Sequence, residues 1–216
     1  MRFGREMNEG VAGIILAGGL SRRMGGGDKA LAPLGRSTLL AQVIHRLRPQ
    51  VGALALNANG DPARFGALSL PVVADTVPGF AGPLAGLLAG LEWAAAATPC
   101  RWLATAASDT PFFPEDLVRR LLAATAGRAS TIAVARCGER RHPTFALWPL
   151  TLTDPLRRML VDDGNRRVTA FIDANAHVDV DFPPAELAGG GTFDPFFNIN
   201  TPQDLAEAER LSRSLA

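Results

Sequence analysis

Short apolar runs alternate with helical patterns along most of the chain, and this alternation limits the fold more than any other feature of the sequence. The run VAGIILA at residues 11–17 stops at two glycines, which is typical of a buried strand. Residues 38–47 then place apolar side chains at helical spacing. Repeated pairs of this kind predict βαβ units. We therefore expect an α/β fold with a mostly parallel sheet and helices on both faces.

The same reasoning divides the rest of the chain into predicted elements. Strands are expected at residues 52–56, 71–74, 102–106, 131–136, 144–148 and 177–181. Helices are expected at residues 83–97, 114–126, 150–161, 168–175 and from 202 to about 215. The last helix has a distinct start, because Thr201 is a preferred cap, Pro202 suits the first helical position and Asp204 lies three residues after the cap. Residues 183–191 are expected to form a loop.

Length and charge restrict the kind of protein. The 216 residues contain no repeat or linker, so residues 11–216 are expected to form a single domain. Residues 1–10 carry charge without an apolar segment and are expected to be a disordered extension. A net charge of +1 without a long basic run argues against nucleic-acid binding. No apolar stretch reaches the roughly 18 residues that cross a bilayer, so we expect a cytoplasmic protein without membrane contact.

The two cysteines, Cys100 and Cys137, form no CxxC pair and accompany no histidine cluster. A disulfide framework or a structural zinc site is therefore not expected. Both are expected to be small buried side chains.

Polar residues or glycines follow four of the predicted strands. They are Gly18-Gly19, Asn57, Asp75 and Asp109. Because ligands of parallel sheets bind where the strands reach their carboxyl ends, these residues are expected along one edge of the sheet. Asn57 and Asp75 could bind a base or ribose there, or could simply stabilise turns.

The loop from Leu16 to Lys29 is rich in glycine and basic residues. Glycines let backbone N–H groups approach a polyphosphate, and Arg22, Arg23 and Lys29 add positive charge. The loop lacks the Gly-Lys-Ser/Thr of a Walker A motif and the spacing of a dinucleotide fingerprint. Its composition alone leaves two interpretations open, a phosphate site and a flexible turn.

Asp109 stands at a strand end in the segment S-D-T-P-F-F-P. Mg²⁺ in proteins takes one or two carboxylates together with phosphate oxygens, so Asp109 is a candidate metal ligand. The alternative is an aspartate that caps the helix predicted at 114–126.

Two basic groups and two asparagines are candidates for contacts with a second, anionic substrate. They are Arg140, Arg141 and His142 in G-E-R-R-H-P-T-F, Arg166 and Arg167 in D-G-N-R-R, and Asn198 and Asn200 in F-F-N-I-N-T-P. The alternatives are a solvated charged surface for the arginines and loop hydrogen bonds for the asparagines, which could also contact metal or phosphate.

Taken together, these blocks resemble those of the molybdenum cofactor guanylyltransferase family. The matching segments are L-A-G-G-x-S-R-R-M-G-G-x-D-K, N-A-N, Asp75 with G-P-L-A-G, D-T-P, R-x-H-P-T and N-x-N-T-P. They occur in the family's order from about residue 11 to residue 211. The sequence departs from its relatives mainly at Ala106-Ala107-Ser108, where they often carry proline and cysteine.

The resemblance implies a three-layer Rossmann-like nucleotidyltransferase fold. It also implies transfer of GMP from GTP to the terminal phosphate of molybdopterin, release of pyrophosphate, a need for Mg²⁺, and transient contact with molybdoenzyme chaperones. Residues expected at the nucleotide are Leu16, Ala17, Gly18, Gly19, Lys29, Asn57, Asp75 and Asp109, with Asp109 also on the metal. The molybdopterin phosphate is already an anion, so catalysis is expected to rest on positioning and charge neutralisation by Lys29, Arg23 and Asp109.

Other functions stay open at this point. The cytidylyl enzyme of the same pathway tends to carry L-A-A-G, whereas this chain has L-A-G-G at Leu16–Gly19, which favours GTP over CTP. Sugar-nucleotide pyrophosphorylases share the fold and a similar first loop, but they are normally longer and lack the R-x-H-P-T block. A nucleotide sensor without catalysis would not require Lys29 and Asp109 together.

Overall fold

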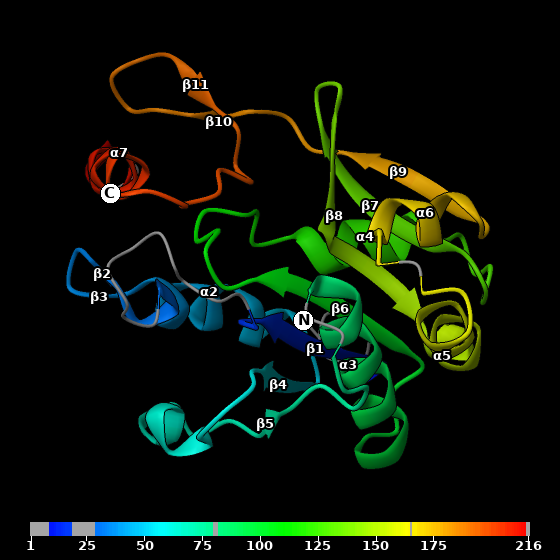
Figure 1. Ribbon diagram of the computed structural model, residues 1–216. Coiled ribbons are helices and arrows are strands. Elements are labelled where there is room, and N and C mark those ends of the chain that lie inside the picture. Colours follow the sequence, from blue (N-terminus) through cyan, green and yellow to red (C-terminus); the bar gives the residue numbers. More distant parts are fainter. Residues whose placement is uncertain (1–8, 19–28, 80–81, 165, 215–216) are drawn as a thin grey trace.

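A sheet of seven strands forms the centre of the computed structural model, which describes residues 9–18, 29–79, 82–164 and 166–214 (Figure 1). In spatial order the strands are β5 (Val72–Val73), β4 (Ala53–Asn57), β1 (Val11–Leu16), β6 (Trp102–Ala107), β8 (Arg140–Pro149), β7 (Ile132–Cys137) and β9 (His177–Asp181). Of these strands, β8 is the one that runs antiparallel to its neighbours. The prediction of a mostly parallel sheet is confirmed.

Helices cover both faces of this sheet. Helices α2 (Leu39–Leu47) and α4 (Leu117–Ala124) pack in one buried cluster, and α3 (Pro83–Ala97), α5 (Thr153–Val161) and α6 (Val168–Asp173) pack in another. Successive residues of a strand point to opposite faces, so Ile14 of β1 joins the second cluster while Ile15 joins the first. The two clusters confirm a three-layer α/β fold (Figure 1).

The last helix, α7 (Pro202–Ser214), lies apart from these layers, near the small hairpin of β2 (Pro33–Leu34) and β3 (Ser37–Thr38) (Figure 1). Its start matches the prediction. The Thr201 hydroxyl accepts the N–H of Asp204 at 3.1 Å, and the Asp204 carboxylate accepts the N–H of Thr201 at 2.9 Å. This reciprocal pair satisfies two backbone donors that the first helical turn leaves unpaired.

Strand β8 differs from the prediction, because it begins at Arg140 rather than at residue 144. It pairs with β7 through a tight turn in which Gly138 adopts φ +56°. Pro143, which has no N–H to donate, lies where the register between the two strands shifts. The charged residues and the proline resemble a loop in sequence, and only pairing with β7 makes this segment a strand.

Two smaller elements also differ from the prediction. Helix α4 begins at Leu117 instead of residue 114, and the Gln50 side chain accepts the N–H of Val118 at 2.9 Å. The loop expected at 183–191 contains β10 (Ala185–Glu186), which pairs with β11 (Thr192–Phe193). The remaining elements are the 3-10 turns η1 (Lys29–Leu31), η2 (Arg48–Gln50), η3 (Pro62–Leu68) and η4 (Leu150–Leu152).

Cys100 and Cys137 are buried and free, as expected. Among the helices that the structure describes, none combines the length and the apolar character needed to cross a bilayer.

Candidate active site at the carboxyl edge of the sheet

The four parallel strands β5, β4, β1 and β6 are neighbours, so their carboxyl ends meet at one edge of the sheet (Figure 1). Asn57 is the last residue of β4, and Asp75, Gly18 and Asp109 follow the ends of β5, β1 and β6. The edge is continuous beyond the strands, because the N–H of Ala17 donates to the carbonyl oxygen of Asn57 at 2.9 Å. The prediction that these residues share one edge is therefore confirmed.

Lys29 joins two distant segments at the β6 end of this edge. Its Nζ donates to Asp109 Oδ2 at 2.7 Å and to Asn200 Oδ1 at 2.8 Å. The Lys29 and Asp109 side chains are only 15% and 20% exposed, so solvent screens their attraction less than that of a surface pair. The structure thus brings together a lysine, a carboxylate and a carboxamide that lie far apart in the sequence.

The start of α7 fixes the backbone of Asn200. The N–H of Asn200 donates to Asp204 Oδ2 at 2.8 Å, and this hydrogen bond is the main reason why the pKa of Asp204 is lowered. The N–H of Ile199 donates to the Asp109 carbonyl oxygen at 3.0 Å. The hydrogen bonds made by the N–H groups of Ile199 and Asn200 therefore hold the Asn200 backbone beside Asp109.

Asp109 does not cap α4, which was the alternative that the sequence left open. The residue at the cap position is Asp116, and its side chain makes no capping hydrogen bond. The Asp109 carboxylate accepts hydrogen bonds from Lys29 and, at 3.3 Å, from the Thr110 hydroxyl. Asp109 is consequently available for chemistry at the sheet edge.

The oxygens of Asp109 and Asn200 suit a divalent cation. They already hold one cationic group between them, the Lys29 ammonium. Within the described ranges, no group of three His, Cys, Asp or Glu side chains converges as a metal site would require. Two protein oxygens fit Mg²⁺, which takes one or two protein ligands and completes its shell with water and phosphate oxygens.

Asp75 is held at the opposite end of the edge by two asparagines. The side-chain amides of Asn57 and Asn59 donate to its two carboxylate oxygens at 2.9 and 2.8 Å. The N–H of Asp75 donates back to Asn59 Oδ1 at 2.9 Å. Asn57 is only 2% exposed and also donates to the Val73 carbonyl oxygen, so it shapes the site mainly through Asp75.

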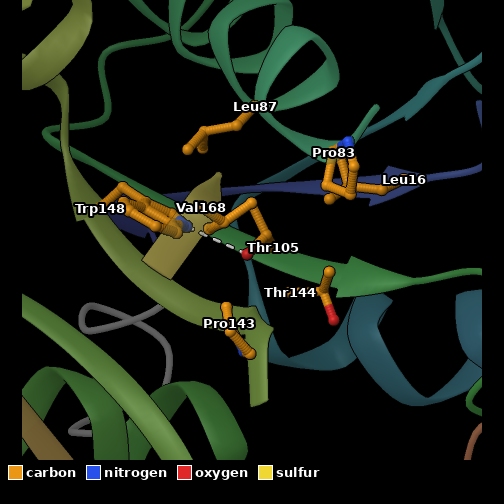
Figure 2. A pocket seen from close by; sticks show the side chains of 8 residues that line it. All are labelled: Leu16, Pro83, Leu87, Thr105, Pro143, Thr144, Trp148 and Val168. Carbon is orange, nitrogen blue, oxygen red and sulfur yellow. Dashed lines mark hydrogen bonds between the residues drawn. The ribbon is translucent and has the colours of Figure 1, made fainter. Parts of the chain in front are cut away.

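A small apolar notch lies where four elements meet at this edge. Figure 2 shows Leu16, Pro83, Thr144 and Val168 around it. Behind them, Trp148 Nε1 donates to the Thr105 hydroxyl at 3.0 Å. Since Val168 begins α6, the preceding segment with Arg166 and Arg167, both exposed, reaches the region where β1 ends.

The arginines of the R-R-H-P-T block have different surroundings. The Arg141 guanidinium lies 2.8 Å from Asp173 in α6 and 2.8 Å from Asp179 in β9, so it ties these elements together. Arg140 is exposed at the start of β8. Because β8 is antiparallel to β6, this start lies at the same edge as the strand ends described above.

His142 is buried inside the molecule, with 6% of its surface exposed. Its ring stacks on Phe196 with 4.5 Å between centroids, and its Nε2 lies 3.4 Å from Asp194 Oδ2. Burial lowers the pKa of His142, while the Asp194 charge acts in the opposite direction. His142 therefore packs β8 against the segment that leads to Asn200.

Three further candidate residues from the sequence are Asn198, Gly19 and Arg23. The Asn198 Oδ1 is buried and accepts no hydrogen bond from the described residues. Gly19 and Arg23 lie outside the described residues.

Comparison with known proteins shows the family to which the chain belongs. Residues 13–179 match the family model described as the MobA-like NTP transferase domain. The molybdenum cofactor guanylyltransferase of Mesorhizobium japonicum is 59% identical over 209 residues, which cover 97% of this chain and 99% of the relative. The protein of the same name from Rhodopseudomonas palustris strain BisB5 is 52% identical over 200 residues and covers 92% of each chain.

A solved structure supports the fold. The molybdopterin-guanine dinucleotide biosynthesis protein A of Archaeoglobus fulgidus superimposes with a TM-score of 0.69 and 24% identity, over 94% of this chain and 98% of that one. At this identity the likeness concerns the fold alone.

Proposed function

Because this chain belongs to the MobA-like NTP transferase family, we propose that it transfers GMP from GTP to the terminal phosphate of molybdopterin, with release of pyrophosphate. The observation that carries the proposal is the Lys29 ammonium held against Asp109 at the carboxyl edge, next to the end of β1. Nucleotidyl transfer needs a cationic group and a metal-binding carboxylate at the same phosphates. The family relationship supplies the identity of the two substrates.

The nucleotide would lie along the edge from Asp75 to Asp109. The proposed contacts are Leu16, Ala17, Gly18, Gly19, Lys29, Asn57, Asp75 and Asp109, with Asn57 acting through Asp75. The base and ribose would lie toward Asp75 and the triphosphate toward Lys29. The order of the strands supports this direction, because β5 and β6 stand on opposite sides of β1.

Asp75 supports GTP over CTP. A carboxylate accepts hydrogen bonds and donates none. The Watson–Crick edge of guanine offers two adjacent donors, N1–H and the 2-amino group, whereas that of cytosine offers one amino group beside two acceptors. The two asparagine amides keep the Asp75 carboxylate in one orientation, which would suit recognition of two parallel donors.

Asp109 and Asn200 are the residues that would hold Mg²⁺. A metal ion bound there would neutralise negative charge on the phosphate oxygens of the nucleotide. The same two residues contact the Lys29 ammonium, so lysine and metal would act on adjacent phosphates.

The reaction requires no covalent intermediate with the protein. An oxygen of the molybdopterin phosphate attacks the α-phosphorus of GTP, the new phosphorus–oxygen bond forms, and the bond to the β-phosphate breaks. Negative charge moves onto the departing pyrophosphate. Lys29, the amides of Gly18 and Gly19, and Arg23 would stabilise that charge, while the sheet edge holds the reacting groups in line.

The second substrate would approach from the side of β8 and α6. Arg140, Arg166 and Arg167 are exposed at this side and would attract its phosphate. Asn198 is a further proposed contact of this substrate; its side-chain oxygen is buried and accepts no hydrogen bond from the described residues. Arg141 and His142, which the sequence also suggested as contacts of this substrate, would affect its binding indirectly. Arg141 holds α6 and β9 in place, and His142 packs on Phe196.

One assay tests the proposal. Purified protein is supplied with Mg²⁺, molybdopterin, and either GTP or CTP, and the dinucleotide product and pyrophosphate are measured. We expect the guanine dinucleotide and one pyrophosphate per product. Preference for CTP would overturn the base assignment alone. GTP binding without pyrophosphate release would instead indicate a nucleotide sensor and would overturn the catalytic proposal.

A further inference from the structure

Gly86 lies in α3 directly against the carboxamide of Asn57. A Cβ atom at position 86 would come within 2.2 Å of Asn57 Oδ1 and 2.9 Å of its Cγ. Real Cβ atoms essentially never approach other atoms this closely, so any side chain at position 86 would displace the carboxamide. Glycine inside a helix lowers its stability relative to alanine, and this contact supplies a reason to have glycine there.

The displaced group is the one that orients Asp75. Asn57 lies at the end of β4, and its amide donates to the Asp75 carboxylate at 2.9 Å and to the Val73 carbonyl oxygen at 3.1 Å. The carboxamide is therefore confined on one side by these two acceptors and on the other by the α3 backbone. A side chain at position 86 would push the carboxamide out of this confined position and disturb the geometry of its hydrogen bond to Asp75.

We propose that Gly86 is a positioning residue of the nucleotide site: its lack of a side chain lets the Asn57 carboxamide lie against α3 and hold the Asp75 carboxylate in its binding orientation. The inference rests on the proposed role of Asp75 in binding GTP. It assigns to α3 a part in nucleotide affinity that does not require contact between α3 side chains and the nucleotide.

Gly90 provides a matched control on the same face of α3, one turn further along. A Cβ at position 90 would lie 2.9 Å from two Ile14 side-chain atoms and 3.0 Å from Leu103 Cδ2. Gly90→Ala therefore also crowds a buried contact, but at the hydrophobic core and not at Asn57. Both substitutions are expected to lower the thermal stability, whereas only Gly86→Ala should weaken nucleotide binding.

The experiment measures the equilibrium Kd for GTP with Mg²⁺ by calorimetry, and the steady-state KM and kcat for GTP, on wild-type protein and the two variants. For Gly86→Ala we expect Kd and KM to rise about ten-fold or more, the size of a lost hydrogen bond to a charged group, with kcat largely kept because Lys29 and Asp109 are untouched. Gly90→Ala should keep the wild-type Kd and KM. Equal Kd values for Gly86→Ala and wild type would overturn the inference.

A double-mutant cycle with Asn57→Ala tests the route through Asn57. Asn57→Ala removes the carboxamide without adding atoms, so it should raise the Kd for GTP by itself, and Gly86→Ala should then add little. Additive effects would contradict the inference. Should Gly86→Ala fail to fold, an unchanged Kd in Asn57→Ala would contradict it equally. Wild-type protein that does not bind GTP would instead overturn the proposed function.

Discussion

The Nζ of Lys29 lies 2.7 Å from Asp109 Oδ2, across 80 residues of sequence. Lys29 is also the only lysine in the chain. The pair lies at the end of β6. Asn200, just before α7, accepts a second hydrogen bond from the Lys29 ammonium. A cation and an anion held in this way can exchange partners when phosphates and a metal ion arrive, because each would gain a new counter-charge.

Removing either charge should strongly slow turnover. Lys29→Ala and Asp109→Ala are each expected to lose more than about 100-fold in kcat, the size observed when one preorganised charge-stabilising group is removed. Pyrophosphate release measures the effect. Arg210→Ala, which breaks the remote Arg210–Glu207 pair of α7, is the control and should keep normal turnover. Near-normal rates in both site variants would contradict the mechanism.

Substrate should protect Lys29 from acylation. With a limiting dose of acetic anhydride, Lys29 is the one side-chain amine that can react, because the chain has no other lysine. GTP with Mg²⁺ is expected to slow its acetylation several-fold, as measured by mass spectrometry of the peptide. The N-terminal amine serves as the internal control. Equal acetylation of Lys29 with and without nucleotide would show that the nucleotide binds elsewhere.

Turnover should require a divalent metal ion, and Asp109 should take part in binding it. A chelator is expected to abolish pyrophosphate release, and Mg²⁺ should restore it. Asp109→Asn keeps an oxygen but loses the charge, so it should raise the Mg²⁺ concentration that gives half-maximal activity. Asp116→Asn, at the start of α4, is the control and should leave that concentration unchanged. Full activity in the presence of chelator would refute the metal assignment.

Stability should fall in mild acid because of His142. Burial lowers the pKa of His142 in the folded protein below its ordinary value of about 6.5, despite the opposing charge of Asp194; Arg140 adds to the lowering. Below that pH the unfolded chain binds the proton more readily than the folded chain, so the free energy of unfolding decreases as the pH falls. Above it, this contribution does not change with pH.

Urea unfolding at several pH values between about 7.5 and 5 tests this sign. His142→Gln should reduce the slope of the free energy of unfolding against pH. The exposed His45 gives the matched control, since His45→Gln should keep the wild-type slope. An unchanged slope in His142→Gln would show that other groups cause the acid sensitivity.

Arg141 should matter for stability more than for nucleotide chemistry. Its guanidinium pairs with Asp173 and Asp179. Arg141→Gln is expected to lower Tm by about 2–4 °C, which corresponds to about 1 kcal/mol in a protein of this size. Its KM for GTP should stay at the wild-type value. Arg167→Gln is the comparison: the proposed function expects it to raise the KM for molybdopterin without a similar loss of Tm. A raised KM for molybdopterin in Arg141→Gln, together with a lowered Tm in Arg167→Gln, would instead assign each arginine the role proposed for the other.

Local patterns in the sequence determined most of the fold. The predicted helix at 83–97 and strand at 177–181 have the same bounds in the structure, because each has a clear apolar pattern and distinct end signals. The α7 cap followed from Thr201 and Asp204 alone, since both partners lie within one helical turn. The shared edge of Asn57, Asp75 and Asp109 followed from parallel strands, whose carboxyl ends point the same way.

Contacts between distant segments were decided only by the tertiary structure. Asn200 lies 171 residues from Lys29 in sequence, and no local pattern could indicate that its side chain would accept a hydrogen bond from the same ammonium group that contacts Asp109. His142 and Arg141 are adjacent in the chain, yet one is buried against Phe196 and the other bridges two aspartates, because β8 turns them to different neighbours. Local spacing determines which elements form and where they end. Which of the several arginines and asparagines reach the site depends on which surfaces pack together.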